Sequence, residues 1–327
     1  MSVKIGVGVW TFGMGSCRYV GEGYKPYIPF EQRVRAISAI KGVGGIEITY
    51  PGDLNEESWP QAKVLLDECG LSIIAIGVEL VCDKQWKNGS LASPEKGRRE
   101  ISIKLVKNAM KFARSIGVNM VNLWLGQDGF DYVFQIDYAA AYANLVESLR
   151  ECAKSEPSVN LGLEYKVSEP KMSCLIKNSG IALACACDTG CDNVGVTLDI
   201  GHAFNAGESP AEVASILLHK NRLFHVHLND NYRIADDDLP VGSVHWPQYF
   251  ELFYWMDKLG YGGWYSLDLY PYRDDPTVAC QTSIQFIHGA TDFVKNKLPA
   301  DFVATCGKSG ESPLNQLFGA FFGEVLL

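Results

Sequence analysis

VGVTLDIGHAFNAGESPAEVASILLHKNRLFHVHLND, residues 194–230, is the stretch that decides the fold. Mostly apolar runs at 194–198 and 223–228 lie on either side of a helical stretch at 211–220. Short apolar runs bounded by Gly and polar turns are typical of strands in a sheet that is buried on both faces. The stretch therefore predicts a strand, a helix and a second strand, the order from which α/β folds are built.

The same alternation extends over most of the chain. Further strands are predicted at 5–9, 45–49, 72–78, 120–125, 161–165 and 264–269. Helical stretches between them are predicted near 31–41, 58–69, 93–116, 139–155, 172–188, 247–259 and 279–297. Eight strands and eight helices in strict alternation fit either a closed (β/α)8 TIM barrel or a doubly wound open sheet.

Residues at the predicted strand ends favour the barrel. In a barrel the carboxyl ends of all strands meet at one mouth, whereas an open sheet spreads them along a row. A dinucleotide-binding sheet is weakly supported, because the GxGxxxxG formed by Gly6, Gly8 and Gly13 begins inside a strand. We therefore expect a single barrel domain over 1–297 and a C-terminal extension, 298–327, that packs on it or contacts another subunit. The strand-end residues are Tyr50, Trp124, Glu164, Asp199, His227 and Asp268.

Composition narrows the possible partners and location. The 327 residues carry a net charge of −9 with scattered Lys and Arg, which argues against a nucleic-acid partner. We expect no secretion leader and no membrane contact, since no apolar run approaches the roughly 18 residues of a membrane span. Ten cysteines without paired CxxC spacing indicate reduced thiols. These features predict a cytoplasmic protein.

Four strand-end residues are of metal-ligand type: Glu164, Asp199, His227 and Asp268. Three carboxylates and one imidazole suit a divalent ion such as Mn²⁺, Co²⁺ or Mg²⁺. His225 and His227 point to the same side of their strand, so one can bind the ion while the other packs one layer lower. We expect His227 to be the ligand.

A second set of candidate ligands lies beside the first. His202 follows Asp199 by three residues in a predicted short loop, and Asp236 and Asp238 have the spacing that lets both face one side. With Asp199 bridging, they could hold a second ion at the separation typical of two-metal sites. Lys166, two residues beyond Glu164, could stabilise negative charge on a substrate.

Each of these residues has a structural alternative when considered alone. A strand-end carboxylate is often only hydrogen-bonded, a single strand histidine more often belongs to the core, and three consecutive aspartates usually form a solvated turn. Together they would bring five carboxylates into one concave site, where like charges drive protonation unless cations are present. The combination therefore favours a site for two divalent ions.

The motifs LEYK, TLDIGH, LFHVHLND, ADDDLPVG and SLDLYPYRDD resemble the sugar isomerases of the xylose isomerase-like barrel superfamily, with L-rhamnose and xylose isomerases the most similar. The resemblance spans about 5–297 and is specific over 161–275. It implies a homo-oligomer, dimeric or tetrameric, that interconverts an aldose and a ketose. The open-chain monosaccharide would react by a metal-assisted hydride shift between C1 and C2.

The resemblance also implies roles for individual residues. Glu164, Asp199, His227 and Asp268 match the ligands of a structural ion, and His202, Asp236 and Asp238, with Asp199, match those of a catalytic ion. Catalysis would rest on Lys166, Asp236, Asp238 and Glu164. Substrate contacts are expected from Trp124, His202, Tyr50 and Arg233.

The pattern departs from xylose isomerases in one place, and two alternatives remain. Tyr50 and Asp53 stand in the segment where those enzymes carry a ring-opening histidine. HVHLNDNYR also fits a ketose 3-epimerase with one metal and two glutamate bases, in which Arg233 would contact substrate. In this sequence Asp268 would take the place of the second glutamate, and its side chain is one methylene shorter. The other alternative is a sugar-binding barrel without catalysis.

Overall fold

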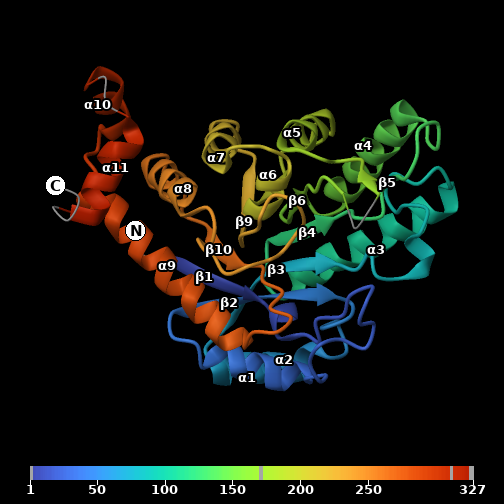
Figure 1. Ribbon diagram of the computed structural model, residues 1–327. Helices are drawn as coiled ribbons and strands as arrows, with labels where there is room; N and C mark the ends of the chain where they lie inside the picture. The colour runs from blue at the N-terminus through green and yellow to red at the C-terminus, as the bar shows by residue number, and fades with distance from the viewer. Residues whose placement is uncertain (1–2, 169–171, 310–311, 324–327) are drawn as a thin grey trace.

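A computed structural model describes residues 3–168, 172–309 and 312–323. Eight parallel strands close into a barrel in the order β1-β10-β9-β8-β6-β4-β3-β2, so neighbours in the chain are neighbours in the barrel (Figure 1). This confirms the predicted (β/α)8 architecture. The strands are β1 Lys4–Gly8, β2 Val43–Tyr50, β3 Ser72–Val78, β4 Met120–Trp124, β6 Asn160–Glu164, β8 Val194–Asp199, β9 Leu223–Leu228 and β10 Trp264–Leu267.

A ring of helices covers the outside of the barrel, as Figure 1 shows. Several begin where the sequence offers a side-chain cap: Asp137, Asn178, Ser209 and Asp275 each accept a backbone N–H in the first turn. The outer helices are α1 Phe30–Ser38, α2 Trp59–Cys69, α3 Lys96–Ser115, α4 Tyr138–Ser155, α5 Ser179–Asp188, α7 Pro210–His219, α8 Trp246–Lys258 and α9 Pro276–Lys297. Short helices are η1 Val9–Phe12, η2 Lys84–Trp86 and α6 Ile200–Asn205.

Two local predictions were wrong. The helix expected over 172–188 begins only at Ser179, because Ser173–Cys174 (β7) pairs with Gly129–Phe130 (β5) in a small antiparallel sheet. His202 lies on α6 rather than in a loop, since the Asp199 carboxylate caps that helix by accepting the His202 backbone N–H at 2.8 Å. Both differences arise from hydrogen bonds that residue-type periodicity does not reveal.

The barrel interior is polar. Branched apolar side chains normally fill the centre of such a barrel. Here the Glu47 carboxylate of β2 bonds to His225 and His227 of β9, strands that are not neighbours, so all three side chains point inward. Glycine makes room nearby: a Cβ on Gly162 would lie 2.3 Å from Met120 Cε. The apolar core therefore lies between strands and helices.

The segment after α9 packs on the outside of the barrel. It forms α10 Phe302–Ser309 and α11 Pro313–Phe322, at the end of α9 (Figure 1). Phe321 stacks on Trp246 of α8 with ring centroids 5.5 Å apart and lies 5.3 Å from Phe293 of α9. In the described part of the chain, no helix has the length and apolar character needed to cross a membrane.

Candidate metal centre

Glu164, Asp199, His227 and Asp268, called the inner cluster below, gather at the mouth of the barrel. Glu164 and Asp199 end β6 and β8, His227 is the last residue but one of β9, and Asp268 directly follows β10. One ligand atom from each lies within 4.8 Å of the others. His227 Nδ1 is 3.3 Å from Glu164 Oε1, 3.4 Å from Asp268 Oδ2 and 3.9 Å from Asp199 Oδ2. The predicted ligands of the first ion therefore converge on one point.

Neutral donors hold the carboxylates of the inner cluster in place. Asn122 Nδ2 donates to Glu164 Oε2 at 2.5 Å, and Trp10 Nε1 donates to Asp268 Oδ1 at 2.6 Å. In both carboxylates the other oxygen faces His227. Asn229 Nδ2 likewise donates to Asp199 Oδ2 at 2.8 Å. Sequence reasoning missed these donors; a buried-strand or strand-end position was their only signal.

Glu47 is a further residue that the sequence interpretation did not assign to the site. Its carboxylate lies 3.1 Å and 3.2 Å from His227 Nε2 and 2.8 Å from His225 Nε2. All three side chains are buried. A charged residue inside the otherwise apolar strand GGIEITY was the available signal. His225 takes the expected position of a packed neighbour of His227.

Lys166, His202, Asp236 and Asp238, called the rim cluster below, lie next to the inner cluster. Asp236 Oδ2 is 2.7 Å from Lys166 Nζ and 3.2 Å from His202 Nε2. His202 Nδ1 is 3.5 Å from Glu164 Oε1, which connects the two clusters. The Lys166 ammonium also lies 4.9 Å from the ring centroid of Trp124, so the predicted lysine and tryptophan come together.

The two loop aspartates flanking Asp237 face the site, and Asp237 has another partner. Asn229 Nδ2 donates to Asp238 Oδ1 at 3.4 Å, which joins Asp238 to the residue that holds Asp199. Asp238 adopts a left-handed backbone with φ 46°. The carboxylate of Asp237 instead accepts the backbone N–H of Tyr232 at 3.0 Å.

The residues fit one divalent ion fully and a second in part. Among the described residues, only the inner cluster and the Glu47–His225–His227 group bring three or more donor side chains within 4.8 Å of one another. In the rim cluster, His202 Nδ1 and Asp236 Oδ1 are buried without a hydrogen-bond partner in the described structure. Buried polar atoms normally have partners, so these two suit a ligand that the side chains alone do not supply.

Charges in the inner cluster oppose one another. Burial raises the pKa of Asp268 to about 7. The charges of Asp199 and Glu164 add to this rise, and the charge of His227 opposes it. Burial also raises the pKa of Asp199. At Glu164 burial is outweighed by His227, and the pKa falls to about 2. The crowding of three carboxylates around one imidazole therefore favours protonation of Asp199 and Asp268, whose protons a divalent cation would displace, whereas Glu164 stays ionised.

Neighbouring groups in the rim cluster differ in protonation. Burial disfavours the charged form of His202, but Asp199 and Asp236 outweigh it and raise its pKa to about 9. Burial of Asp236 is outweighed by His202 and Lys166, so the pKa of Asp236 is lowered. Burial and Asp236 together raise the pKa of Asp238 well above its ordinary value. Two adjacent carboxyl groups with separated pKa values suit an acid and a base.

Two predicted substrate contacts lie elsewhere. The Tyr50 hydroxyl donates to Glu56 at 3.2 Å, and its ring packs on Phe112 of α3 with centroids 5.4 Å apart. Tyr50 thus faces the helices, on the opposite side of β2 from Glu47. Arg233 is exposed, with Nε 3.0 Å from His245 Nε2 and its guanidinium 5.2 Å from the Phe204 ring centroid. The structure does not bring either residue to the clusters.

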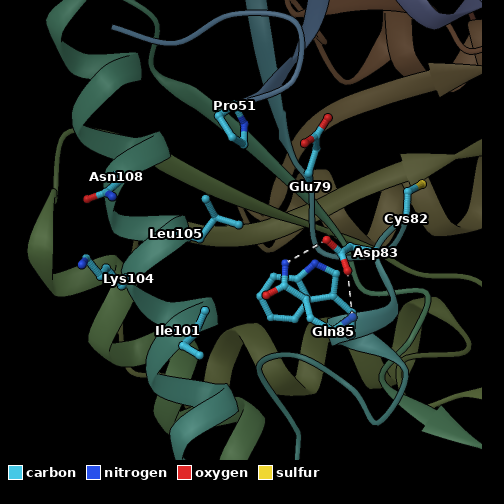
Figure 2. A pocket seen from close by; sticks show the side chains of 10 residues that line it. Pro51, Glu79, Cys82, Asp83, Gln85, Ile101, Lys104, Leu105 and Asn108 are labelled. Atoms are coloured by element: carbon cyan, nitrogen blue, oxygen red, sulfur yellow. Dashed lines mark hydrogen bonds between the residues drawn. The ribbon is translucent and has the colours of Figure 1, made fainter.

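A cavity of about 500 Å³ lies outside both clusters. Figure 2 shows it between one face of α3 and the segment that follows β3. None of the predicted site residues lines it. Its lining residues are Pro51, Glu79, Cys82, Asp83, Gln85, Trp86, Ile101, Lys104, Leu105 and Asn108.

Comparisons with known proteins agree with this architecture. Residues 34–288 match the family model described as xylose isomerase-like TIM barrel. A xylose isomerase from Thermus thermophilus is 24% identical over 229 residues, which cover 65% of this chain and 57% of that protein. The chain thus spans less than two thirds of that relative.

Solved structures show the same fold at low sequence identity. An L-ribulose 3-epimerase is 17% identical with a TM-score of 0.71, covering 95% of this chain and 100% of its own. A 3-keto-D-glucoside 4-epimerase from E. coli is also 17% identical, with a TM-score of 0.67 and coverages of 88% and 100%. Since the family model covers most of the barrel described above, this chain belongs to the xylose isomerase-like TIM barrel family.

Proposed function

We propose that this protein is a metal-dependent sugar isomerase that interconverts an aldose and a ketose. The observation that carries the proposal is the rim cluster, in which Asp236 Oδ2 is shared by Lys166 and His202 next to four side chains that could hold a metal ion. The similarity to a protein named xylose isomerase supports the same activity. The substrate would be an open-chain monosaccharide.

The donor set suits one or two divalent ions. Glu164, Asp199, His227 and Asp268 would hold the first, and His202, Asp236 and Asp238, sharing Asp199, would hold the second. Oxygen and imidazole ligands suit Mn²⁺, Co²⁺ or Mg²⁺. When bound, such an ion supplies Lewis-acid polarisation of the sugar oxygens.

The side chains of the rim cluster would manage charge and protons. In the forward direction the proton on the C2 hydroxyl leaves, hydride moves from C2 to C1, and the oxygen on C1 takes up a proton. Lys166, held in position by Asp236, would donate a hydrogen bond to the carbonyl oxygen and stabilise the negative charge that develops there. Asp236 as acceptor and Asp238 as donor would exchange the hydroxyl proton.

A ketose 3-epimerase is the competing function, and one observation favours it. Glu164 and Asp268 both lie close to His227 Nδ1, at 3.3 Å and 3.4 Å, so the site brings together two carboxylates that could exchange a proton with carbon. Against it, Arg233 stacks on Phe204 instead of reaching the site. The sequence also supplies a lysine and an aspartate pair that this chemistry leaves without a role.

Product analysis in deuterium oxide separates the two functions. A panel of aldoses and ketoses is incubated with the protein and added Mn²⁺, Co²⁺ or Mg²⁺, and isomers and epimers are resolved by chromatography. Isomerisation by hydride shift gives C1–C2 products without solvent deuterium on carbon. Products epimerised at C3 and labelled with deuterium would contradict the isomerase and support the epimerase, whereas sugar binding without turnover would support the non-catalytic barrel.

The assembly is proposed as a homo-oligomer, a dimer or tetramer. Phe321 and Phe322 of α11 remain partly exposed and could contact another subunit. Light scattering after size-exclusion chromatography measures the mass directly, and a mass near the 36.0 kDa of one chain would contradict an oligomer.

A further inference from the structure

We propose that Glu47 is a positioning residue that decides which nitrogen of His227 faces the inner cluster. The inference rests on the metal-binding part of the proposed function and adds a residue that the ligand pattern does not include. Glu47 lies on β2, and the two strands next to β2 contribute none of the four residues of the inner cluster. The Glu47 carboxylate reaches across the barrel to β9.

The hydrogen-bonding roles of the three side chains are fixed by their chemistry. An ionised carboxylate can only accept hydrogen bonds. Because Glu47 lies 2.8 Å from His225 Nε2 and 3.1 Å from His227 Nε2, both of these nitrogens must carry the hydrogen that is donated. In neutral His227 the lone pair is then on Nδ1, the atom that lies among the three carboxylates of the inner cluster.

Burial makes this constraint strong. Glu47 is 0% exposed, and His225 and His227 are 3% and 1% exposed, so water does not compete for the hydrogen bonds. His225 occupies the second acceptor position of the carboxylate and keeps it from rotating away from His227. Carboxylates that accept from the far nitrogen of a metal-bound imidazole fix the ring and increase its basicity.

Glu47, His225 and His227 could in principle form a separate ion site, because their donor atoms also lie within 4.8 Å of one another. That arrangement would remove the donated hydrogens that balance the buried Glu47 charge. It would also take His227 from the three carboxylates, the group with the larger excess of negative charge. The geometry therefore assigns His227 Nδ1 to the inner cluster and Glu47 to its support.

The main test measures metal affinity without any sugar. The Glu47→Gln variant removes the charge and replaces one acceptor oxygen by an NH₂ group, which donates hydrogen bonds and cannot accept one from an imidazole N–H. Isothermal titration with Mn²⁺ should show binding about 10–100-fold weaker than in the unchanged protein. Nitrogen-15 NMR should show His227 protonated on Nε2 in the unchanged protein and a shifted tautomer population in the variant; six histidines keep the spectrum simple.

A second buried carboxylate–histidine pair provides a matched control. Asp230 Oδ1 lies 2.7 Å from His245 Nδ1, and Asp230 is 0% exposed. Its other oxygen accepts the backbone N–H groups of Val244 and His245 before α8. Asp230→Asn should lower the melting temperature and leave the Mn²⁺ affinity unchanged. Glu47→Asp keeps the charge with a shorter reach, so its affinity should fall between those of the unchanged protein and Glu47→Gln.

The outcomes separate this inference from the proposed function. Wild-type Mn²⁺ affinity in a folded Glu47→Gln variant, or an equal loss in Asp230→Asn, would overturn the positioning role. If Glu47→Gln does not fold, unchanged affinity in Glu47→Asp overturns it in the same way. An unchanged protein that binds Mn²⁺ through a Glu47-dependent site but converts no sugar keeps this inference and removes the proposed activity.

Discussion

The inner and rim clusters are adjacent but are built differently. Inner-cluster ligands sit on strand ends, and Asn122, Asn229 and Trp10 each hold one of their carboxylates. The rim cluster sits on a short helix and loops, and Asp236 and His202 each keep a buried polar atom without a partner in the described structure. Rigid elements give more precise sites than loops do. The comparison suits the proposed roles, in which the inner cluster would hold an ion and the rim cluster would change partners during the reaction.

The largest expected effect is loss of turnover at the rim. Asp236→Asn removes the charge that pairs with Lys166 and His202 and should lower kcat about 10³-fold, within the range of a lost acid or base. Mn²⁺ binding at the inner cluster should persist in titration. Asp237→Asn is the control, because that carboxylate contacts Tyr232 and should leave kcat unchanged. Full activity of Asp236→Asn would remove the rim cluster from catalysis.

Lys166→Met should produce the next largest effect. The substitution keeps packing against Trp124 but removes the ammonium, so kcat should fall about 10²-fold, as for loss of one donor to a developing charge. KM should change little if the interaction forms mainly in the transition state. Steady-state kinetics at saturating metal gives both numbers. A change confined to KM would make Lys166 a binding residue only.

Removing metal should affect stability through the inner cluster. An ion present at 100 times its dissociation constant stabilises the folded state by about 2.7 kcal/mol. At about 2–4 °C per kcal/mol, chelation with EDTA should lower the melting temperature by roughly 5–10 °C. Asp268→Asn should abolish most of this difference in calorimetry, whereas Asp236→Asn should retain most of it. If chelation changed the melting temperatures of the two variants equally, the inner and rim clusters would not differ in their contribution to metal binding.

The smallest effect is expected at Arg233. Because its guanidinium lies over Phe204 and its Nε donates to His245 Nε2, Arg233→Ala should change kcat/KM by no more than about twofold, the usual range for a surface substitution. The assay uses whichever sugar the panel identifies. A loss of 100-fold or more would mean that Arg233 contacts substrate, as the epimerase requires.

The fold could be predicted from sequence because each strand is a short apolar run in an alternating series. The proximity of the inner-cluster residues could be predicted because barrel topology brings strand ends together. Glu47 could not, since it meets His227 across 180 residues of chain and only through the closed barrel. Tyr50 illustrates the opposite case: it occupies a strand end, yet side-chain alternation turns it toward Phe112. The helix predicted over 172–188 forms only from Ser179, because pairing of Ser173 and Cys174 with β5 outweighs local preference.

Gly162 has a consequence for engineering. A methyl group there would lie 2.3 Å from Met120 Cε and from the Thr197 hydroxyl oxygen, so a single added carbon has to displace these side chains. Filling a cavity with apolar atoms is a common way to raise stability. At Gly162 the added atoms would instead crowd the barrel interior, where the Glu47 carboxylate holds the rings of His225 and His227 in place. Substitutions meant to raise the melting temperature are therefore better placed in the apolar layer between strands and helices, where added packing does not disturb the polar side chains inside the barrel.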